Sequence, residues 1–581
     1  MTELLSGQGR THQAAALAAL LATAFVVLAI AGTARMYTPV PFWDMWGATL
    51  GFYIAINDGA HWLWWAQHNE HRIVLSRLLF WLDYRLFGGL SIFLLVMNQV
   101  FVGLAVVLFW RLSQHRLRTV GASRTMLFFV TCFLVAWLFQ WMQHENLAWA
   151  FQSQFFLAQL LPLCAFYWLH KSAAGEQSAN TAFVIACLFG IASVGTMANG
   201  VLALPLMALY ALISRMRIWR VLLLCGMSIA MLGLYFHDYQ APPYHGSTVD
   251  ALLHQPLEVV QFVLLYLGTP FFNLFGRGTL ATVIAMVSTC VMAAIALTYL
   301  YRGIRSPKNN TLILALVFGI IYLAGTALGT ASGRVTFGVL QAVSYRYTTP
   351  ALMAWACVLV LLLPWLCRQV KHHPRLIIAT ATVVVGLMLN LQWRAAIPQH
   401  QLVFDREVAG LALTLGVEDE AQIQHVFEMS PGLLRTVEVA ETRQLGMFGI
   451  YPWRGLKGAL GNTVTHPSLP RCAGHVDIVA PVNADQDYLA IQGWLYNAER
   501  QQVPALITVT DGAGVVRGFA LTGQPRSDVA DAVDDNAYLS GFRGYVSRDL
   551  AGDAAVLIAD TAACELPLEL SIEPPTPVSN P

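Results

Sequence analysis

The chain has 581 residues, of which 57% are hydrophobic and only 12% are charged. A soluble globular protein carries about 25% charged residues, so this composition excludes an ordinary soluble chain and predicts helices that face lipid. The net charge of +1 hides a division, because residues 1–400 hold 23 Lys and Arg against 10 Asp and Glu, whereas residues 401–581 hold 11 against 23. We therefore expect a membrane domain with a charge of +13 followed by an acidic soluble domain with a charge of −12.

Apolar stretches long enough to cross a bilayer predict about eleven transmembrane helices. They lie near residues 14–33, 88–110, 124–142, 151–170, 180–197, 201–214, 221–237, 279–301, 311–330, 348–367 and 375–392. The first is longer than the apolar core of a signal peptide, so we interpret it as a retained helix. The expected fold class is mainly α, with a polytopic helical domain over residues 1–392 that has the lipid bilayer as a partner.

A twelfth apolar run, residues 257–275, contains Gly268-Thr269-Pro270. If this run does not cross, the basic clusters between the other helices all fall on the cytoplasmic side, as the positive-inside rule requires. We therefore predict a re-entrant or interfacial segment that is broken at Pro270. Eleven crossings from a cytoplasmic N-terminus place the C-terminal domain outside, which for a bacterial inner membrane is the periplasm.

With this topology, eight of the ten acidic residues before position 401 lie on the outer face. Asp44 is the first of them and follows the first helix in Phe42-Trp43-Asp44. A partly desolvated carboxylate can serve as a general base near neutral pH, so Asp44 is a candidate catalytic residue. The alternative is that Asp44 caps the helix that follows it.

The same outer loop contains the polar run Gln67-His68-Asn69-Glu70-His71-Arg72. On a helix, His68 would share a face with His71 and Arg72, and the guanidinium of Arg72 could bind a phosphate. The alternative is a solvated loop with local pairs.

Two further outer segments carry polar side chains. His144-Glu145-Asn146 is followed by Gln152 and Gln154 as the chain returns to the membrane, which suggests an inward-facing cavity or, alternatively, helix caps and interhelical hydrogen bonds. Arg346 lies between two tyrosines at the start of a membrane helix, where it could bind a lipid phosphate or anchor the helix at the interface.

Four short motifs together carry a family resemblance. They are Phe42-Trp43-Asp44, Asn69-Glu70-His71-Arg72, His144-Glu145-Asn146 and Arg346-Tyr347. Over residues 1–400 the chain resembles the GT-C superfamily of membrane glycosyltransferases and looks like uncharacterised bacterial members of it. The resemblance implies a first outer loop with an essential acid and a polyprenyl-phosphate sugar as donor.

The resemblance implies an inverting attack in which Asp44 takes the proton of an acceptor hydroxyl. Arg346, with Arg72 or His71, would stabilise the leaving polyprenyl phosphate. Many members carry a pair of acids in this loop, and here the second acid could be Asp58 or Glu70. A divalent metal therefore stays open as a cofactor. The substrate-binding residues that we expect are Glu70, His71, Arg72, His144, Glu145, Arg346 and Tyr347.

Residues 393–470 read as a linker region with helical segments, and residues 471–581 as a periplasmic β-sandwich of jelly-roll type. The expected strands are 488–496, 505–509, 515–521, 544–547 and 554–558. Cys472 and Cys564 bracket this domain and are expected to form a disulfide in an oxidising compartment. Trp494 could stack on a sugar, although a core position is the more common place for a tryptophan.

The sequence lacks nucleotide-binding loops, so an activated lipid-linked donor is the expected energy source. We expect a membrane glycosyltransferase that transfers a sugar from a polyprenyl-phosphate donor to an envelope glycan, lipid or protein acceptor, with no nucleic-acid partner. The alternatives are a lipid-linked glycan transporter or flippase, and an O-antigen ligase or polymerase.

Overall fold

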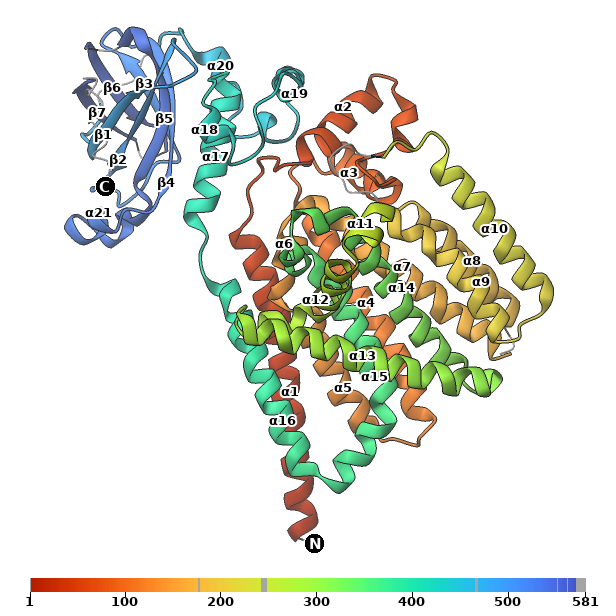
Figure 1. Ribbon diagram of the computed structural model, residues 1–581. Helices are drawn as coiled ribbons and strands as arrows, with labels where there is room; N and C mark the ends of the chain where they lie inside the picture. Colours follow the sequence, from red (N-terminus) through yellow and green to blue (C-terminus); the bar gives the residue numbers. More distant parts are fainter. Residues whose placement is uncertain are drawn as a thin grey trace. The chain divides into compact units, whose positions relative to one another are not determined.

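The computed structural model describes residues 2–175, 178–241, 248–464, 469–550, 552–561 and 563–570. The chain divides into two compact units (Figure 1). The helical unit comprises Met1–Ala34, Trp62–Leu79 and Ile92–Ile397, and the mixed unit comprises Arg35–His61, Phe80–Ser91 and Pro398–Pro581. The first outer loop predicted from the sequence is therefore shared between the two units.

Nine helices of the described ranges are long and apolar enough to cross a membrane, so the chain is a multi-pass membrane protein. These segments are His12–Arg35, Ile92–Arg118, Arg124–Ala148, Ile218–Phe236, Pro256–Leu274, Thr279–Arg305, Thr311–Phe337, Tyr345–His372 and Pro374–Ala396. The helices of these segments are α1 (Thr2–Arg35), α4 (Ile92–Arg118), α5 (Arg124–Leu138), α10 (Ile218–Phe236), α12 (Pro256–Leu274), α13 (Thr279–Arg305), α14 (Thr311–Arg334), α15 (Thr348–His372) and α16 (Pro374–Gln392).

Three more helices correspond to expected crossings. They are α7 (Ser153–Ala173), α8 (Ala179–Val194) and α9 (Ala203–Ile213), of which the last two are short. Close contacts bind the helices together. A side chain at Gly32 of α1 would collide with the ring of Trp141, and Gln392 of α16 donates to the carbonyls of Phe25 and Phe139.

Helix α12 differs from the expected broken segment, because it is continuous through Pro270. A proline within a helix removes one backbone donor and leaves nearby carbonyls without their usual bonds. Neighbouring side chains bond carbonyls of this stretch: Thr289 donates to Leu264 and Trp355 donates to Leu267. The helix nevertheless continues through Pro270, and its length and composition suit a crossing.

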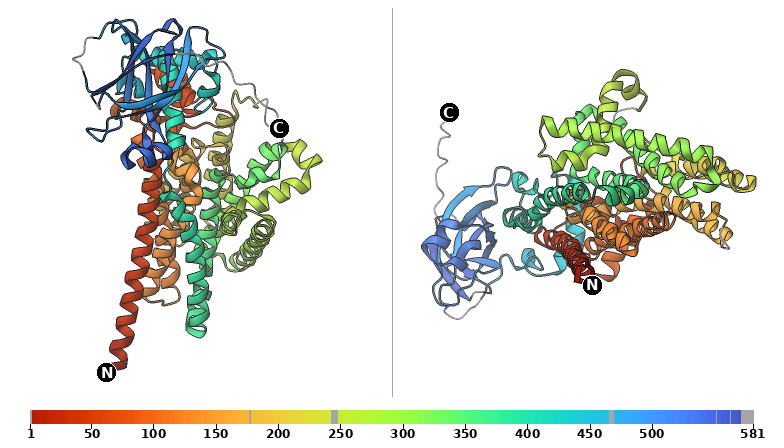
Figure 2. Two further views of the ribbon diagram at one scale, coloured as in Figure 1. Left: turned by 90° about the vertical axis from the view of Figure 1, so that its left-hand side faces the viewer. Right: turned by 90° about the horizontal axis from the view of Figure 1, so that it is seen from below.

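Helix α13 runs across the direction of α1. Figure 1 and the right-hand view of Figure 2 both show α13 lengthwise. The right-hand view of Figure 2 looks along α1. A helix that crosses the direction of α1 lies closer to the plane of a bilayer that α1 spans. The expected crossing at residues 279–301 is thus an oblique helix.

The mixed unit has a helical layer and a sheet. The helices include α2 (Phe52–Asn57), α17 (His400–Leu415), α18 (Glu420–Ile423), α19 (Pro431–Thr442) and α20 (Leu456–Ala459), and the division between the units falls within α3 (Val74–Leu86). Their core joins Trp46 and Leu50 of the N-terminal loop to Val408 and Leu411 of α17 and to Phe519 of the sheet. Residues from the expected linker thus form part of a packed core.

The sheet has seven antiparallel strands in the order β1-β2-β5-β4-β3-β6-β7. They are β1 (Ala473–Pro481), β2 (Tyr488–Tyr496), β3 (Leu506–Asp511), β4 (Val516–Gln524), β5 (Gly541–Ser547), β6 (Ala554–Ala559) and β7 (Cys564–Glu569). The five expected strands are present, with β1 and β7 in addition. A disulfide joins Cys472 to Cys564, and the amide of Cys472 donates to the carbonyl of Glu565, so the two edges of the sheet meet.

This single curled sheet differs from the two facing sheets of the expected sandwich. One face encloses a core around Ile491, Val509 and Leu557. The other face packs through Phe519 and Tyr545 against the helical layer. Because helices cover the second face, the strands bury both faces without a second sheet.

Candidate functional site

The polar run at residues 67–72 forms a tight turn rather than the helix we considered. The amides and carbonyls of His68 and His71 exchange two hydrogen bonds, at 2.7 and 2.8 Å. Asn69 between them has a φ of +48°, a left-handed conformation that asparagine tolerates better than most residues. The i, i+4 relation of His68 and Arg72 therefore does not apply.

Arg72 holds this turn in place and is a structural residue. Its three guanidinium nitrogens donate to the carbonyls of Trp65, Tyr235 and His237 at 2.6–2.8 Å. Its guanidinium also lies over the rings of Trp65 and Tyr235, and the side chain is 4% exposed. These bonds tie Arg72 to the backbone of α10 and of the preceding loop, and its role in binding a phosphate stays a prediction.

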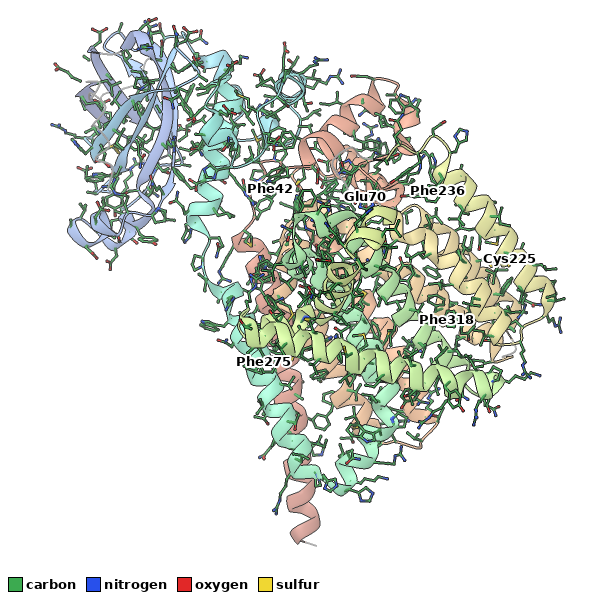
Figure 3. All side chains as sticks on the ribbon, in the orientation of Figure 1. Phe42, Glu70, Cys225, Phe236, Phe275 and Phe318 are labelled. Atoms are coloured by element: carbon green, nitrogen blue, oxygen red, sulfur yellow. A yellow bond between two sulfur atoms is a disulfide. The ribbon has the colours of Figure 1, made fainter. Side chains whose placement is uncertain are left out.

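Glu70 and His71 point to one another from the turn. The Nε2 atom of His71 lies 3.4 Å from a carboxylate oxygen of Glu70, and its Nδ1 accepts a bond from the amide of Ala198. Tyr235 near the end of α10 donates to the Glu70 carbonyl. Figure 3 labels Glu70 and the adjoining Phe236 at this end of the helical unit.

Glu145 and Arg346 form the second part of the site. Glu145 lies in α6 (His144–Ala148), and its carboxylate accepts a bond from the backbone amide of Arg346 and lies 3.3 Å from the guanidinium Nε. Ser344 also bonds this Nε. Among the residues the structure describes, nothing bonds the two terminal nitrogens of Arg346, and both side chains are partly exposed. The outer edge of this guanidinium can therefore bind an anion.

Tyr347 follows Arg346 and is buried among aromatic rings. Its ring stacks on that of Tyr266 at 5.1 Å and lies 6.5 Å from that of Phe155. Printed contacts join Glu145 of α6 to Arg346 at the start of α15, whereas Glu70 and His71 pair with each other on the turn. That these residues form one binding site stays a prediction.

Arg334 is a site residue that the sequence reasoning did not select. It ends α14, and its guanidinium lies 6.0 Å from the ring of Phe337. No carboxylate or hydrogen-bond acceptor among the described residues pairs with it. Its position in Ser332-Gly333-Arg334, close in sequence to Arg346, was the available signal, but helix C-termini commonly end in arginine for electrostatic reasons alone.

His144 lies beside this cluster and contacts it through aromatic rings. Its imidazole is 4.3 Å from the ring of Tyr345 and 5.7 Å from that of Trp141. Arg277 donates to the Tyr345 hydroxyl. These contacts give His144 a packing role next to the predicted binding residues.

Asp44, the predicted catalytic base, belongs to the mixed unit. It is half-buried and precedes the π-helix Trp46–Gly51, at whose start Met45 occupies the cap position without a side-chain cap. The backbone carbonyl of Asp44 accepts a bond from the amide of Ala48, so Asp44 occupies the position directly before this helical turn. Arg406 of α17 lies 3.8 Å from the ring of the neighbouring Phe42, so α17 fixes the segment that carries the carboxylate.

The mixed unit also contains two buried acids that act on Tyr37. Burial raises the pKa of Asp83 to about 7, and burial raises the pKa of Glu407 to about 7. The amide of Ser91 donates to Asp83, and the hydroxyl of Tyr37 donates to the carbonyl of Leu90. Both carboxyls contribute, after burial itself, to raising the pKa of Tyr37 to about 12.

No group of three or more His, Cys, Asp or Glu side chains suited to a metal occurs among the described residues.

In the sheet, Trp494 packs against the small cluster of Tyr496, Val529 and Ala537, which is a core-type contact. Searches for similar proteins returned no matching family model, no matching curated protein and no matching solved structure.

Proposed function

We propose that this chain is a membrane glycosyltransferase of the GT-C type, which transfers a sugar from a polyprenyl-phosphate donor to an envelope glycan, lipid or protein acceptor. The observation that carries the proposal is Arg346, whose two terminal guanidinium nitrogens no described residue bonds. Arg334 at the end of α14 likewise has no acceptor among the described residues. An arginine with free nitrogens suits a phosphate group.

The start of α15 supports the same assignment. Arg346 and Tyr347 directly precede this helix of 25 residues, and no side chain caps its first turn. Backbone N–H groups at a helix N-terminus attract anions, because their partial positive charges are unpaired there. The amide of Arg346 is already bonded to the carboxylate of Glu145, so a phosphate at this helix start would interact with the N–H groups that remain.

The proposed reaction assigns a role to Asp44 and to the two arginines. The oxygen of an acceptor hydroxyl attacks the anomeric carbon, and the bond from that carbon to the phosphate oxygen breaks. Polyprenyl phosphate leaves with the bonding electron pair and is stabilised by Arg334 and Arg346. Asp44 takes the proton of the attacking hydroxyl, and the anomeric configuration is inverted.

The proposed location is a bacterial inner membrane with the N-terminus in the cytoplasm and the C-terminal domain in the periplasm. This proposal takes α12 as a helix that does not cross, because only then do the basic clusters between the other helices all lie on the cytoplasmic side, as the positive-inside rule requires. The disulfide between Cys472 and Cys564 supports it independently, because such bonds persist in oxidising compartments.

The test compares Arg346→Gln and Arg334→Gln with Arg302→Gln, which removes an exposed arginine near the C-terminal end of α13. Membrane vesicles receive polyprenyl phosphates that carry radiolabelled hexoses or pentoses. We expect transfer to fall at least about tenfold in each site variant and to persist in the control, since each charged contact contributes about 1.5–3 kcal/mol. Wild-type vesicles that move the lipid across the membrane without transferring sugar would favour a flippase instead.

A further inference from the structure

Beside the arginine pair, the helical unit holds an unusual group of buried amide and hydroxyl side chains. Each is at most 3% exposed, and each has an oxygen with no hydrogen-bond partner among the described residues. The group comprises Asn98, Asn146, Gln152, Ser153, Gln154 and Thr348.

Hydrogen bonds connect several of these side chains to the arginine site. Asn146 donates to the carbonyl of Arg346 at 2.7 Å and to Thr349 at 2.8 Å. Asn98 in turn donates to the carbonyls of Asn146 and Trp149. The nitrogens of these two amides are therefore fixed, and their oxygens remain without a donor.

The segment with the glutamines reaches the same place. Gln152 and Ser153 adjoin the start of α7, and Phe155 in its first turn contacts the ring of Tyr347 at 6.5 Å. A helix start of this kind presents further unpaired backbone N–H groups. The buried oxygens and the phosphate-binding residues thus belong to one connected region.

Native proteins satisfy about nine in ten buried polar groups, because an unpaired one costs about 1–3 kcal/mol. Several unpaired oxygens in one region indicate a ligand that supplies donors. The side chains are uncharged, so they suit a neutral ligand with several hydroxyl groups, each of which can donate and accept.

We propose that these six side chains form a subsite for the sugar ring of the lipid-linked donor, adjacent to the phosphate site. This inference rests on the proposed function and adds the residues that distinguish a sugar-bearing lipid from a bare polyprenyl phosphate. The phosphate arginines bind both lipids, and the amide subsite binds only the one that carries hydroxyl groups.

The test measures binding to full-length protein in lipid nanodiscs. The probes are polyprenyl phosphate and the same lipid linked to glucose, mannose, galactose or arabinose. Gln152→Met keeps the side-chain volume and removes the amide. We expect this variant to bind the preferred sugar-bearing lipid about tenfold more weakly, because one or two hydrogen bonds are lost. Its affinity for the sugar-free lipid should be unchanged. Gln154→Met serves as a second variant and should act in the same direction.

Gln159→Met is the matched control, since Gln159 lies in α7 with Gln154 and its oxygen already accepts a contact from Asn199. It should leave the preference between the lipids unchanged. The inference is overturned if Gln152→Met and Gln154→Met lower the affinity for both lipids equally, or for neither. It is also overturned if their only effect is to stabilise the ligand-free protein against heat. A wild type that binds both lipids alike refutes the subsite alone, whereas one that binds neither also refutes the proposed function.

Discussion

At the scale of single residues, the arginines of the helical unit divide into two kinds. Arg72 is bonded on all three guanidinium nitrogens by backbone carbonyls, whereas Arg346 keeps two nitrogens for a ligand. The sequence identified both as polar residues near the membrane. It could not separate them, because two of the three carbonyls that bind Arg72 come from residues 163 and 165 positions away.

This division predicts different outcomes for the same substitution. Arg72→Lys should lower thermal stability, since an ammonium group cannot bridge three fixed carbonyls, and the loss of buried charged hydrogen bonds costs about 1.5–3 kcal/mol each. Arg346→Lys should leave the unfolding temperature nearly unchanged and weaken the binding of polyprenyl phosphate. Thermal unfolding of the two purified variants checks the distinction, and equal loss of stability in both would count against it.

Asp83 predicts a pH dependence of stability. Its pKa is raised by burial to about 7 in the folded protein, against about 3.9 in an unfolded chain. Folding therefore favours the protonated acid. The contribution of Asp83 to the free energy of unfolding is fully present below about pH 4 and is lost as the pH rises through about 7.

Asp83→Asn should remove this part of the pH dependence and raise the unfolding temperature at pH 8 relative to the wild type. The amide mimics the protonated acid, which accepts the bond from Ser91 without a buried charge. Unfolding temperatures of the two proteins measured from pH 5 to 8 test this. Parallel curves would show that Asp83 does not titrate in this range.

At the scale of elements, the sequence predicted the apolar helices and most strands because their periodicity is local. The expected strand 488–496 matches β2 fully. The errors concern elements set by distant partners. Pro270 predicted a break, but α12 continues through it, packed against α13 and α15. A helical layer covers the sheet in place of the expected second sheet.

The disulfide gives a prediction at this scale. It joins positions 92 residues apart and links the start of β1 to β7. Cys472→Ser with Cys564→Ser should destabilise the sheet by about 2–5 kcal/mol, because the unfolded chain gains freedom. Limited proteolysis with and without reductant measures this loss of stability. Unchanged resistance to the protease after reduction would contradict the structural role of the disulfide.

At the scale of the whole molecule, the division of charge predicted two parts, and the structure has two compact units with different boundaries. The mixed unit includes Arg35–His61 and Phe80–Ser91, so the segment of Asp44 folds with the C-terminal part. Sequence order concealed this, because core residues such as Trp46 and Val408 are far apart along the chain.

The central claim is that the chain transfers a sugar from a polyprenyl phosphate with Asp44 as the base. The most direct measurement is the rate of sugar transfer in vesicles that contain wild-type or Asp44→Asn protein at equal amounts. We predict a fall of at least about 100-fold, since a general base contributes about 10²–10⁴ to a rate, with donor binding retained. Undiminished transfer by Asp44→Asn would contradict the account.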